Sequence, residues 1–387
     1  MKQYFFDIAI IGGGPAGATL ARLLGDCFRV AIIDKRNLEE HSGRTTTIAA
    51  SEKCCGGLVA PDAQAALAQM GLGLPRHVLA GPQLFMVKSI DLQTGLERFY
   101  HRHYININRP DFDRWLFSMI NDCVHCFTES LVISIKSCDP GFSILFRHAG
   151  ITREINAETV IGADGARSIV RRLLYPGKKP SRIYYAMQEW FKVQESQPYF
   201  SAIFDPEITD YYAWTIPKDD CLILGAALEI RNKPLDKMKL LRKKLEARGM
   251  VFGKMIRRKA SFLQRPASGH DVFFGRDNAF LIGEAAGFVS PSSGEGLSYA
   301  MRSAMHLADR MLNRRSSRDC FYGWGFPKQS RMKRIIAGKC FKSAVIFNPF
   351  IRNIIMRTGA GSLKMKLGNK TRKGFCNKEK QAIVPLA

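Results

Sequence analysis

Three glycines and one acidic residue near the start of the chain have the spacing of a dinucleotide-binding turn. Gly12, Gly14 and Gly17 follow a short apolar run in a G-x-G-x-x-G pattern. Asp34 ends a second apolar run, about 20 residues further on. We expect a strand, a tight turn, a helix whose first N–H groups bind a pyrophosphate, and a second strand whose carboxylate accepts ribose hydroxyls. A glycine-rich turn without a ligand is the alternative, but glycines at a helix start cost stability without a compensating role.

Two more acidic residues follow apolar runs later in the chain. Asp164 lies within Gly-Ala-Asp-Gly at 162–165, and Glu284 lies within Gly-Glu-Ala-Ala-Gly at 283–287. We expect each run to be a strand that delivers its acid beside flexible backbone. Pro291 and the glycines of 294–296 come next, before a long helix at 297–312. The cofactor would then be clamped from both ends, with backbone N–H groups at 294–296 near the electron-rich pyrimidine end of a flavin.

A thiol and a guanidinium could complete this site. Cys55 precedes Gly56 and Gly57, whose backbone could approach a planar ligand. We leave two interpretations of Cys55 open, a thiol that lines the cofactor pocket and a small buried residue. Arg109 precedes a helix and could reach a phosphate, although a solvated arginine is equally consistent with the sequence.

A strand at 211–216 carries aromatic residues at alternate positions. Tyr212, Trp214 and Ile216 fall on one face, because successive side chains of a strand point to opposite sides. For Ile216 we favour ordinary core packing. For the two large aromatic residues, a pocket lining and core packing are both open.

Together these separated motifs resemble the fingerprints of the hydroxylase-type FAD flavoproteins, over residues 5–312. With Cys55, Arg109 and the aromatic strand, the chain resembles more narrowly the geranylgeranyl reductase family. The resemblance implies tightly bound, non-covalent FAD and a catalytic set of Cys55, Tyr212 and Trp214. The cofactor-binding residues that it implies are Gly12, Gly14, Ala16, Gly17, Asp34, Lys35, Gly56, Gly57, Arg109, Asp164, Gly165, Gly283, Glu284, Pro291, Gly294, Glu295 and Gly296.

The chain departs from the family pattern at two positions. Glu284 stands where the family usually has Asp, and this longer acid should still reach a hydroxyl. Ile216 stands where the reductases usually have Phe. The second change makes the strand similar to the WxWxIP element of flavin halogenases, with Tyr212 in place of the first Trp.

The order of motifs and strand-rich segments predicts an α/β chain of two domains and a helical tail. We expect a Rossmann-like FAD-binding domain with an inserted antiparallel-sheet substrate domain. The FAD-binding domain is assigned to 1–80, 108–180 and 275–312, the substrate domain to 81–107 and 181–274, and a basic helical C-terminal segment to 313–387.

Composition narrows the class of protein and its partners. The ten cysteines show no extracellular disulfide pattern, and no run reaches the ~20 apolar residues of a membrane-spanning helix. The apolar N-terminal run is used by the glycine motif rather than by a signal peptide, so we expect a cytoplasmic protein. Cys123 and Cys126 lie on either side of His125, but no second cysteine pair accompanies them. This is weak evidence for a zinc site, and we expect no metal.

The C-terminal segment is strongly basic. The net charge is +24, and the residues from Leu312 onward contain eighteen Lys and Arg against two acidic residues. This distribution favours an anionic surface as the partner of the tail rather than a nucleic-acid-binding fold. Residues 332–356 mix many apolar side chains with these charges, and Pro349 divides them. We favour a helical cap on the substrate domain, and a face that binds the inner surface of a membrane is compatible with it.

Three functions are consistent with the sequence. The first is an FAD-dependent oxidoreductase that transfers hydride to a hydrophobic, polyprenyl-like substrate, with NAD(P)H or another reductant as a transient donor. The second is an FAD-dependent monooxygenase or halogenase. The third is a membrane-associated flavoprotein that acts as a redox sensor.

Overall fold

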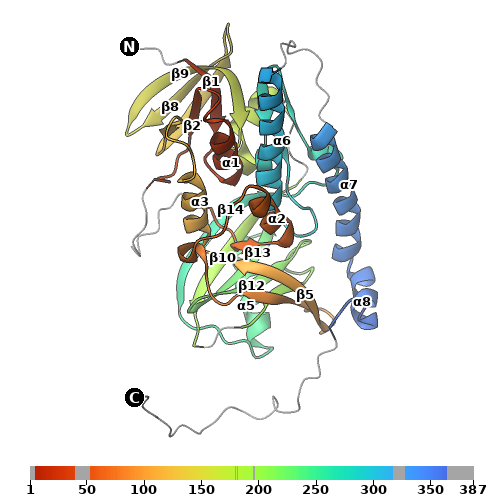
Figure 1. Cartoon of the computed structure of the whole chain (residues 1–387). Helices are drawn as coiled ribbons and strands as arrows, with labels where there is room; N and C mark the ends of the chain where they lie inside the picture. The colour runs from red at the N-terminus through yellow and green to blue at the C-terminus, as the bar shows by residue number, and fades with distance from the viewer. Residues whose placement is uncertain are drawn as a thin grey trace, which may run out of the picture.

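The chain contains two eight-stranded sheets and helices that pack on them, in agreement with the predicted α/β class (Figure 1). The computed structural model describes residues 5–39, 53–178, 180, 182–194, 197–316 and 327–363. Of the predicted basic C-terminal segment, residues 317–326 and 364–387 lie outside this description.

The first sheet is parallel at its centre. Its order is β15-β16-β9-β1-β2-β6, and neighbouring strands from β16 to β6 are parallel. A meander of β7 and β8 pairs antiparallel with β9. The strands are β1 (Phe5–Ile11), β2 (Val30–Ile33), β6 (His125–Phe127), β7 (Ser130–Ser137), β8 (Phe142–His148), β9 (Ile151–Gly162), β15 (Gly275–Arg276) and β16 (Ala279–Leu281).

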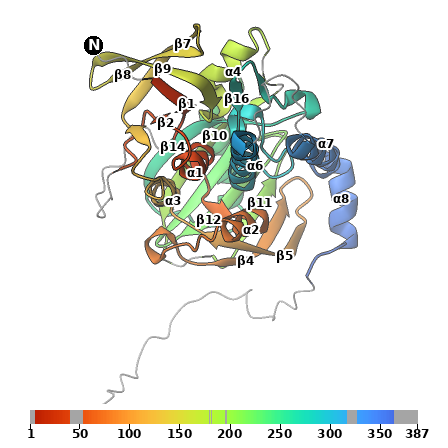
Figure 2. The same cartoon turned by 45° about the horizontal axis from the view of Figure 1, so that its top comes forward.

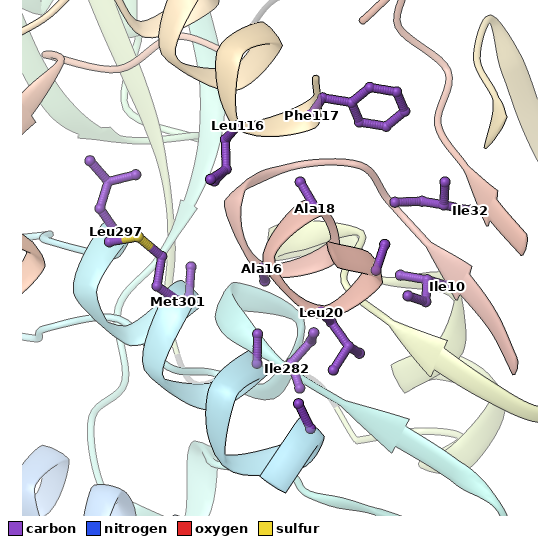
Figure 3. Close-up of a cluster of buried hydrophobic side chains, with 14 of the residues drawn as sticks. Ile10, Ala16, Ala18, Leu20, Ile32, Leu116, Phe117, Ile282, Leu297 and Met301 are labelled. Carbon is purple, nitrogen blue, oxygen red and sulfur yellow. The ribbon is translucent and has the colours of Figure 1, made fainter. Parts of the chain in front are cut away.

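Both faces of this sheet are covered, which explains its apolar strands. On one face Ile10 and Ile32 pack against α1 (Pro15–Leu24), α3 (Arg109–Phe117) and α6 (Leu297–Ser316), where Figure 3 shows Leu20 and Met301. On the other face Ile11 packs against the meander and α4 (Ile169–Leu174). Two short segments, η2 (Gly165–Arg167) and η4 (Gly283–Ala286), follow β9 and β16.

The second sheet has the order β14-β10-β13-β12-β11-β4-β5-β3. Its strands are β3 (Leu58–Val59), β4 (Leu84–Asp91), β5 (Glu97–Asn106), β10 (Ile183–Lys192), β11 (Phe200–Phe204), β12 (Ala213–Lys218), β13 (Cys221–Glu229) and β14 (Met255–Gln264). The predicted antiparallel pairing holds except between β4 and β11, which are parallel. The assigned domain limits remain a prediction, and β3 joins this sheet although its residues were assigned to the FAD-binding domain.

The two faces of the second sheet have different partners. On one face Leu224 packs against Met238 and Leu241 of α5 (Pro234–Glu246). Trp214 and Ile216 share the opposite face, and Tyr212 packs against the same cluster, as the alternation predicts. The remaining helices of the chain are α2 (Pro61–Gln69), η1 (Arg76–Val78), η3 (Gly269–Asp271), α7 (Pro327–Phe347) and α8 (Pro349–Thr358).

The C-terminal helices cap the folded protein along one flank (Figures 1 and 2). Met332 and Ile336 of α7 enter the core beside the first sheet, and Phe347 packs against the aromatic face of the second. In α8, Arg352 Nε lies 2.8 Å from Asp91 Oδ2, and both side chains are buried. The predicted helical tail, divided at Pro349, is therefore present, and it packs against both sheets rather than against the substrate sheet alone. No helix in the described part of the chain is long and apolar enough to cross a membrane.

We predict that Arg352→Met lowers the free energy of unfolding by about 3–5 kcal/mol, because it leaves the Asp91 carboxylate buried without its partner. Burial alone would raise the pKa of Asp91, but the Thr94 N–H and Arg352 lower it. A lowered folded pKa stabilises above the unfolded value near 4, so the gap from wild type should narrow as the pH falls below about 4. Urea unfolding between pH 3 and 8 measures both effects.

Arg357→Met, on the exposed side of the same helix, is the matched control. Its Nε donates to Asn353 Oδ1 at 2.7 Å, and we expect a change within about 0.5 kcal/mol. Equal effects of the two substitutions would show that the buried ion pair does not hold α8 in place.

Candidate functional site

The turn between β1 and α1 is shaped by its glycines. Gly12 has a φ of +105°, and a Cβ built on Gly17 would lie 1.8 Å from the Gly12 carbonyl oxygen. Neither position accepts a side chain without rearrangement. Gly14, at the N-cap of α1, provides no side-chain cap, and the N–H groups of Ala16 and Gly17 in the first turn have no acceptor within the helix. The turn therefore presents, at a helix N-terminus, N–H donors that no residue of the described ranges accepts from.

The segments after β9 and β16 meet this turn. A Cβ on Gly12 would lie 2.5 Å from the Ala163 carbonyl oxygen, and a Cβ on Gly283 would lie 3.0 Å from the Ala16 Cβ. A Cβ on Gly165 would be 3.7 Å from Glu284 Oε2. Three motifs separated by more than a hundred residues thus converge at one edge of the parallel sheet.

The carboxylate of Asp34 is fully engaged by its own chain. Oδ2 accepts bonds from Gly13 N at 2.6 Å and Arg36 Nη2 at 3.0 Å, and Oδ1 accepts from Arg36 N and Nε at 2.8 and 3.0 Å. Ribose hydroxyls could bind here only if Arg36 released part of this contact. Lys35, expected beside the cofactor, is exposed, whereas the neighbouring Arg36 is half-buried.

Arg36 links Asp34 to a second buried ion pair. Its Nη1 lies 2.8 Å from Asp113 Oδ2, and Arg109 Nε lies 2.7 Å from Asp113 Oδ1. Burial alone would raise the pKa of Asp113, but the two guanidinium groups lower it. Arg36 could not be identified from the sequence, because an Arg two residues after a strand also fits a solvated surface.

The other end of Arg109 contacts the predicted thiol. Arg109 Nη1 lies 3.2 Å from Cys55 Sγ, and Gly57 N lies 3.5 Å from the same sulfur. The structure places Cys55, Gly56 and Gly57 beside the second sheet, where Gly56 faces Ile216. Arg109 and Cys55, assigned separate roles in the sequence, therefore form one contact.

Asp164 and Glu284 occupy different environments. Asp164 Oδ2 accepts a bond from Ile169 N at 2.6 Å, whereas the buried Oδ1 has no partner among the described residues. Burial raises the pKa of this carboxyl. Glu284 instead pairs with Lys53 and accepts from Gln264 N at 3.1 Å. Asp164 is the acid that retains an unused acceptor.

The loop from Pro291 to Gly296 connects η4 to α6 and contacts the end of the second sheet. The Pro291 carbonyl accepts bonds from Arg265 Nε at 3.2 Å and Ser343 Oγ at 3.0 Å. The Glu295 carboxylate accepts bonds from Ser298 N and Oγ, both at 2.7 Å, so its side chain caps the first turn of α6.

Tyr212, which is half-buried, and Trp214, which is buried, lie next to this loop, and we call them the aromatic wall. The Tyr212 hydroxyl donates to the Ser293 carbonyl at 2.6 Å, and a Cβ on Gly294 would be 3.6 Å from that hydroxyl. The Tyr212 and Trp214 ring centroids lie 5.5 Å apart. With its amide oriented to satisfy both donors, Gln188 accepts from Trp214 Nε1 and Gly56 N.

Phe347 of α7 continues the aromatic wall. Its ring stacks on Tyr212 at a centroid distance of 6.2 Å and packs on Tyr211 at 4.9 Å. The Arg265 guanidinium lies 4.6 Å from the Phe347 centroid and donates to Ser343 Oγ at 2.8 Å. No local sequence pattern indicates this contact, because it joins residues of the tail to a distant sheet.

Lys218, which no sequence motif indicates, lies next to the glycine pair after Cys55. Its Nζ donates to the carbonyl oxygens of Gly57 at 2.9 Å and Ile107 at 2.6 Å, and also to Asn106 Oδ1. Burial lowers the pKa of Lys218 to about 7. The three acceptors match the three donors of an ammonium group.

The described residues contain no group of three or more His, Cys, Asp or Glu side chains that could hold a metal ion. Within that part of the chain, Cys123 is exposed and Cys126 is half-buried in β6.

Curated relatives match most of the chain, although no family model matches it. Protein CbrA of Escherichia coli O9:H4 (strain HS) is 41% identical over 358 residues, which cover 92% of this chain and 94% of that protein. Protein CbrA of Shigella sonnei (strain Ss046) is 41% identical over 358 residues, with 92% and 98% covered.

Solved structures share the fold at low sequence identity. A geranylgeranyl bacteriochlorophyll reductase-like protein from Thermoplasma acidophilum has a TM-score of 0.71 at 18% identity, with 89% of this chain and 87% of that chain covered. The flavin-dependent halogenase CmlS has 0.67 at 20%, covering 91% and 66%. The probable FAD-dependent monooxygenase pqsL from Pseudomonas aeruginosa has 0.68 at 18%, covering 92% and 99%. These matches establish the two-sheet fold predicted from the sequence.

We predict that Lys218 makes stability rise with pH. A lysine with a folded pKa near 7 and an unfolded pKa near 10.4 releases protons on folding between these values, which adds up to about 1.4 kcal/mol of stability per pH unit. Lys218→Met removes this contribution, so wild type should gain stability relative to the variant from pH 7 to pH 10. Urea unfolding at several pH values measures the difference.

Lys239→Met, on the exposed side of α5, is the control and should differ from wild type by a constant amount. A difference between wild type and Lys218→Met that does not change with pH would contradict the lowered pKa.

Proposed function

We propose that this chain, which belongs to the CbrA family, is an FAD-dependent oxidoreductase that acts on a hydrophobic substrate. The observation that carries the proposal is the meeting of the Gly12 turn, the Asp164 segment and the Gly283 segment at one edge of the parallel sheet. Open α/β sheets bind their ligands at the carboxyl ends of such strands.

Features of this edge fit FAD in particular. Gly14 is open, since the nearest heavy atom to a built Cβ is Arg36 Nη2 at 3.7 Å, so a phosphate could approach the backbone and the N–H groups of Ala16 and Gly17. Asp164 Oδ1 is a buried acceptor to which no described residue donates, which suits a hydroxyl of the ribityl chain or ribose. Pro291 and the backbone of 294–296 would border the flavin ring.

When bound, FAD would supply a carrier that accepts and donates hydride. The protein would supply orientation and the exclusion of water. The Tyr212 ring is fixed by its bond to the Ser293 carbonyl, and Trp214 and Phe347 extend the apolar surface beside it. Such a wall suits a polyprenyl-like chain better than a polar metabolite.

Reduction of a carbon–carbon double bond needs a proton as well as a hydride. The Cys55 thiol could deliver that proton, because Arg109 Nη1 lies 3.2 Å from Sγ and would stabilise the thiolate left behind. Solvent would then return the proton to sulfur. NAD(P)H or another reductant would bind transiently as the electron donor, because the sequence has one G-x-G-x-x-G turn of this kind.

A second candidate, an oxygen-dependent monooxygenase or halogenase, is favoured by the strand that carries Tyr212 and Trp214. Ile216 and Pro217 complete a pattern that is similar to the element of flavin halogenases. The aromatic wall is compatible with either chemistry.

We predict that Gly14→Ala weakens FAD binding at least about tenfold while the fold is retained. Its φ of −72° suits alanine, and the added methyl group clears the chain but would occupy the approach of a phosphate. The apoprotein should change in unfolding free energy by less than about 0.5 kcal/mol. Fluorescence titration of apoprotein with FAD measures the affinity.

Gly338→Ala, where a Cβ would meet nothing within 4 Å, is the matched control. If Gly14→Ala binds FAD as tightly as this control does, the glycine turn is not the phosphate site.

We predict that the reduced enzyme reacts with a polyprenyl lipid. The flavin is photoreduced without oxygen, and the lipid is added while absorbance is followed. Reoxidation with a saturated product in the mass spectrum is the expected result. No response to lipid, with rapid oxygen consumption and an oxygenated or halogenated product, would overturn it in favour of the second candidate.

A further inference from the structure

The outer faces of α7 and α8 carry basic and large apolar side chains together, and we propose that they bind the surface of an anionic lipid bilayer. We call this set of exposed residues the tail surface: Arg331, Arg334, Phe341, Lys342, Phe350, Ile351, Ile354 and Arg357. Both helices lie on one flank of the molecule, and α8 continues from the end of α7 (Figures 1 and 2).

The charged side chains of these helices are all basic. Residues 327–363 contain eight Lys and Arg and no Asp or Glu. Arg352 is buried against Asp91, and Lys339 lies 4.0 Å from Asp62, so these two have acidic partners within the protein. Arg331, Arg334 and Lys342 are exposed, and an anionic surface complements them.

The apolar side chains distinguish a lipid surface from other polyanions. Phe341 and Phe350 are each 76% exposed, and Ile354 is 49% exposed. Large apolar side chains beside basic ones are the combination that inserts into the boundary between headgroups and acyl chains. Nucleic-acid phosphates would bind the basic side chains but would leave Ile354 exposed to water.

These side chains are held outward by contacts on the inner faces. Ser343 and Phe347 bind α7 to the Pro291 loop and to Tyr212, and Arg352 anchors α8. Asn348 Oδ1 caps α8 by accepting from the N–H groups of Phe350 and Ile351 at 3.0 and 3.1 Å. The tail surface is thus pre-organised on a folded support.

The same helix connects this surface to the candidate site. Phe347 belongs to the aromatic wall beside Tyr212, so a lipid that left the bilayer at α7 would be close to the wall. This link rests on the proposed function, whereas binding of the tail surface to a bilayer does not depend on the flavin chemistry.

Vesicle sedimentation tests the proposal with the full-length protein. We expect wild type to bind vesicles of phosphatidylcholine with phosphatidylglycerol and not vesicles of phosphatidylcholine alone. The substitutions Arg331→Gln, Arg334→Gln and Lys342→Gln together should weaken binding by about tenfold to a hundredfold. Phe350→Ser with Ile354→Ser should weaken it by about tenfold.

Two matched variants control for charge and for hydrophobicity. Arg231→Gln, Lys239→Gln and Lys243→Gln remove three exposed charges elsewhere, and Ile230→Ser with Val251→Ser removes two exposed apolar side chains. Both should bind vesicles as wild type does, and circular dichroism verifies that every variant is folded. Equal loss in the control variants would overturn the proposal.

The apolar variant also separates lipid from nucleic acid. If Phe350→Ser with Ile354→Ser leaves vesicle binding unchanged while an oligonucleotide competes with vesicles, the surface is a general polyanion site and the lipid proposal fails. Point substitutions are preferable to deletion of the tail, because deletion also removes Phe347 and Arg352 from the core.

Discussion

The adjacency of three parallel strands is the constraint on which the candidate site depends. Because β1 lies beside β9, and β9 beside β16, the loops at their carboxyl ends must emerge together. The contacts of Gly12 with Ala163 and of Gly283 with Ala16 follow from that pairing. A side chain at Gly17 would collide with the Gly12 carbonyl and force the turn away from α1, so this position requires glycine.

Some buried charged groups stabilise the fold through ion pairs, whereas others keep properties that a functional site could use. Arg36 and Asp113 are paired, and so are Arg352 and Asp91, which holds segments distant in sequence together. Asp164 retains an acceptor that has no partner in the described part of the chain, and Lys218 has a lowered pKa. Unsatisfied or perturbed groups of this kind cluster at functional sites.

The sequence was sufficient where the signal is local. Short segments are enough to predict the glycine turn, the strands that precede Asp164 and Glu284, and the alternation of Tyr212 with Trp214. The parallel pairing of β4 with β11 and the stacking of Phe347 on Tyr212 join segments with no shared local pattern, so the sequence could not reveal them. The capping role of the Glu295 side chain was missed for a different reason, since its position fits cofactor binding equally well.

The flavin content of the purified protein tests the central claim most directly. The protein is expressed as the full chain, its absorbance is recorded between 350 and 500 nm, and the cofactor released by heat is identified by mass spectrometry. The account predicts a yellow protein with one non-covalent FAD per chain. A colourless protein that fails to take up added FAD would contradict it, because the converging strand ends would then have no cofactor to bind.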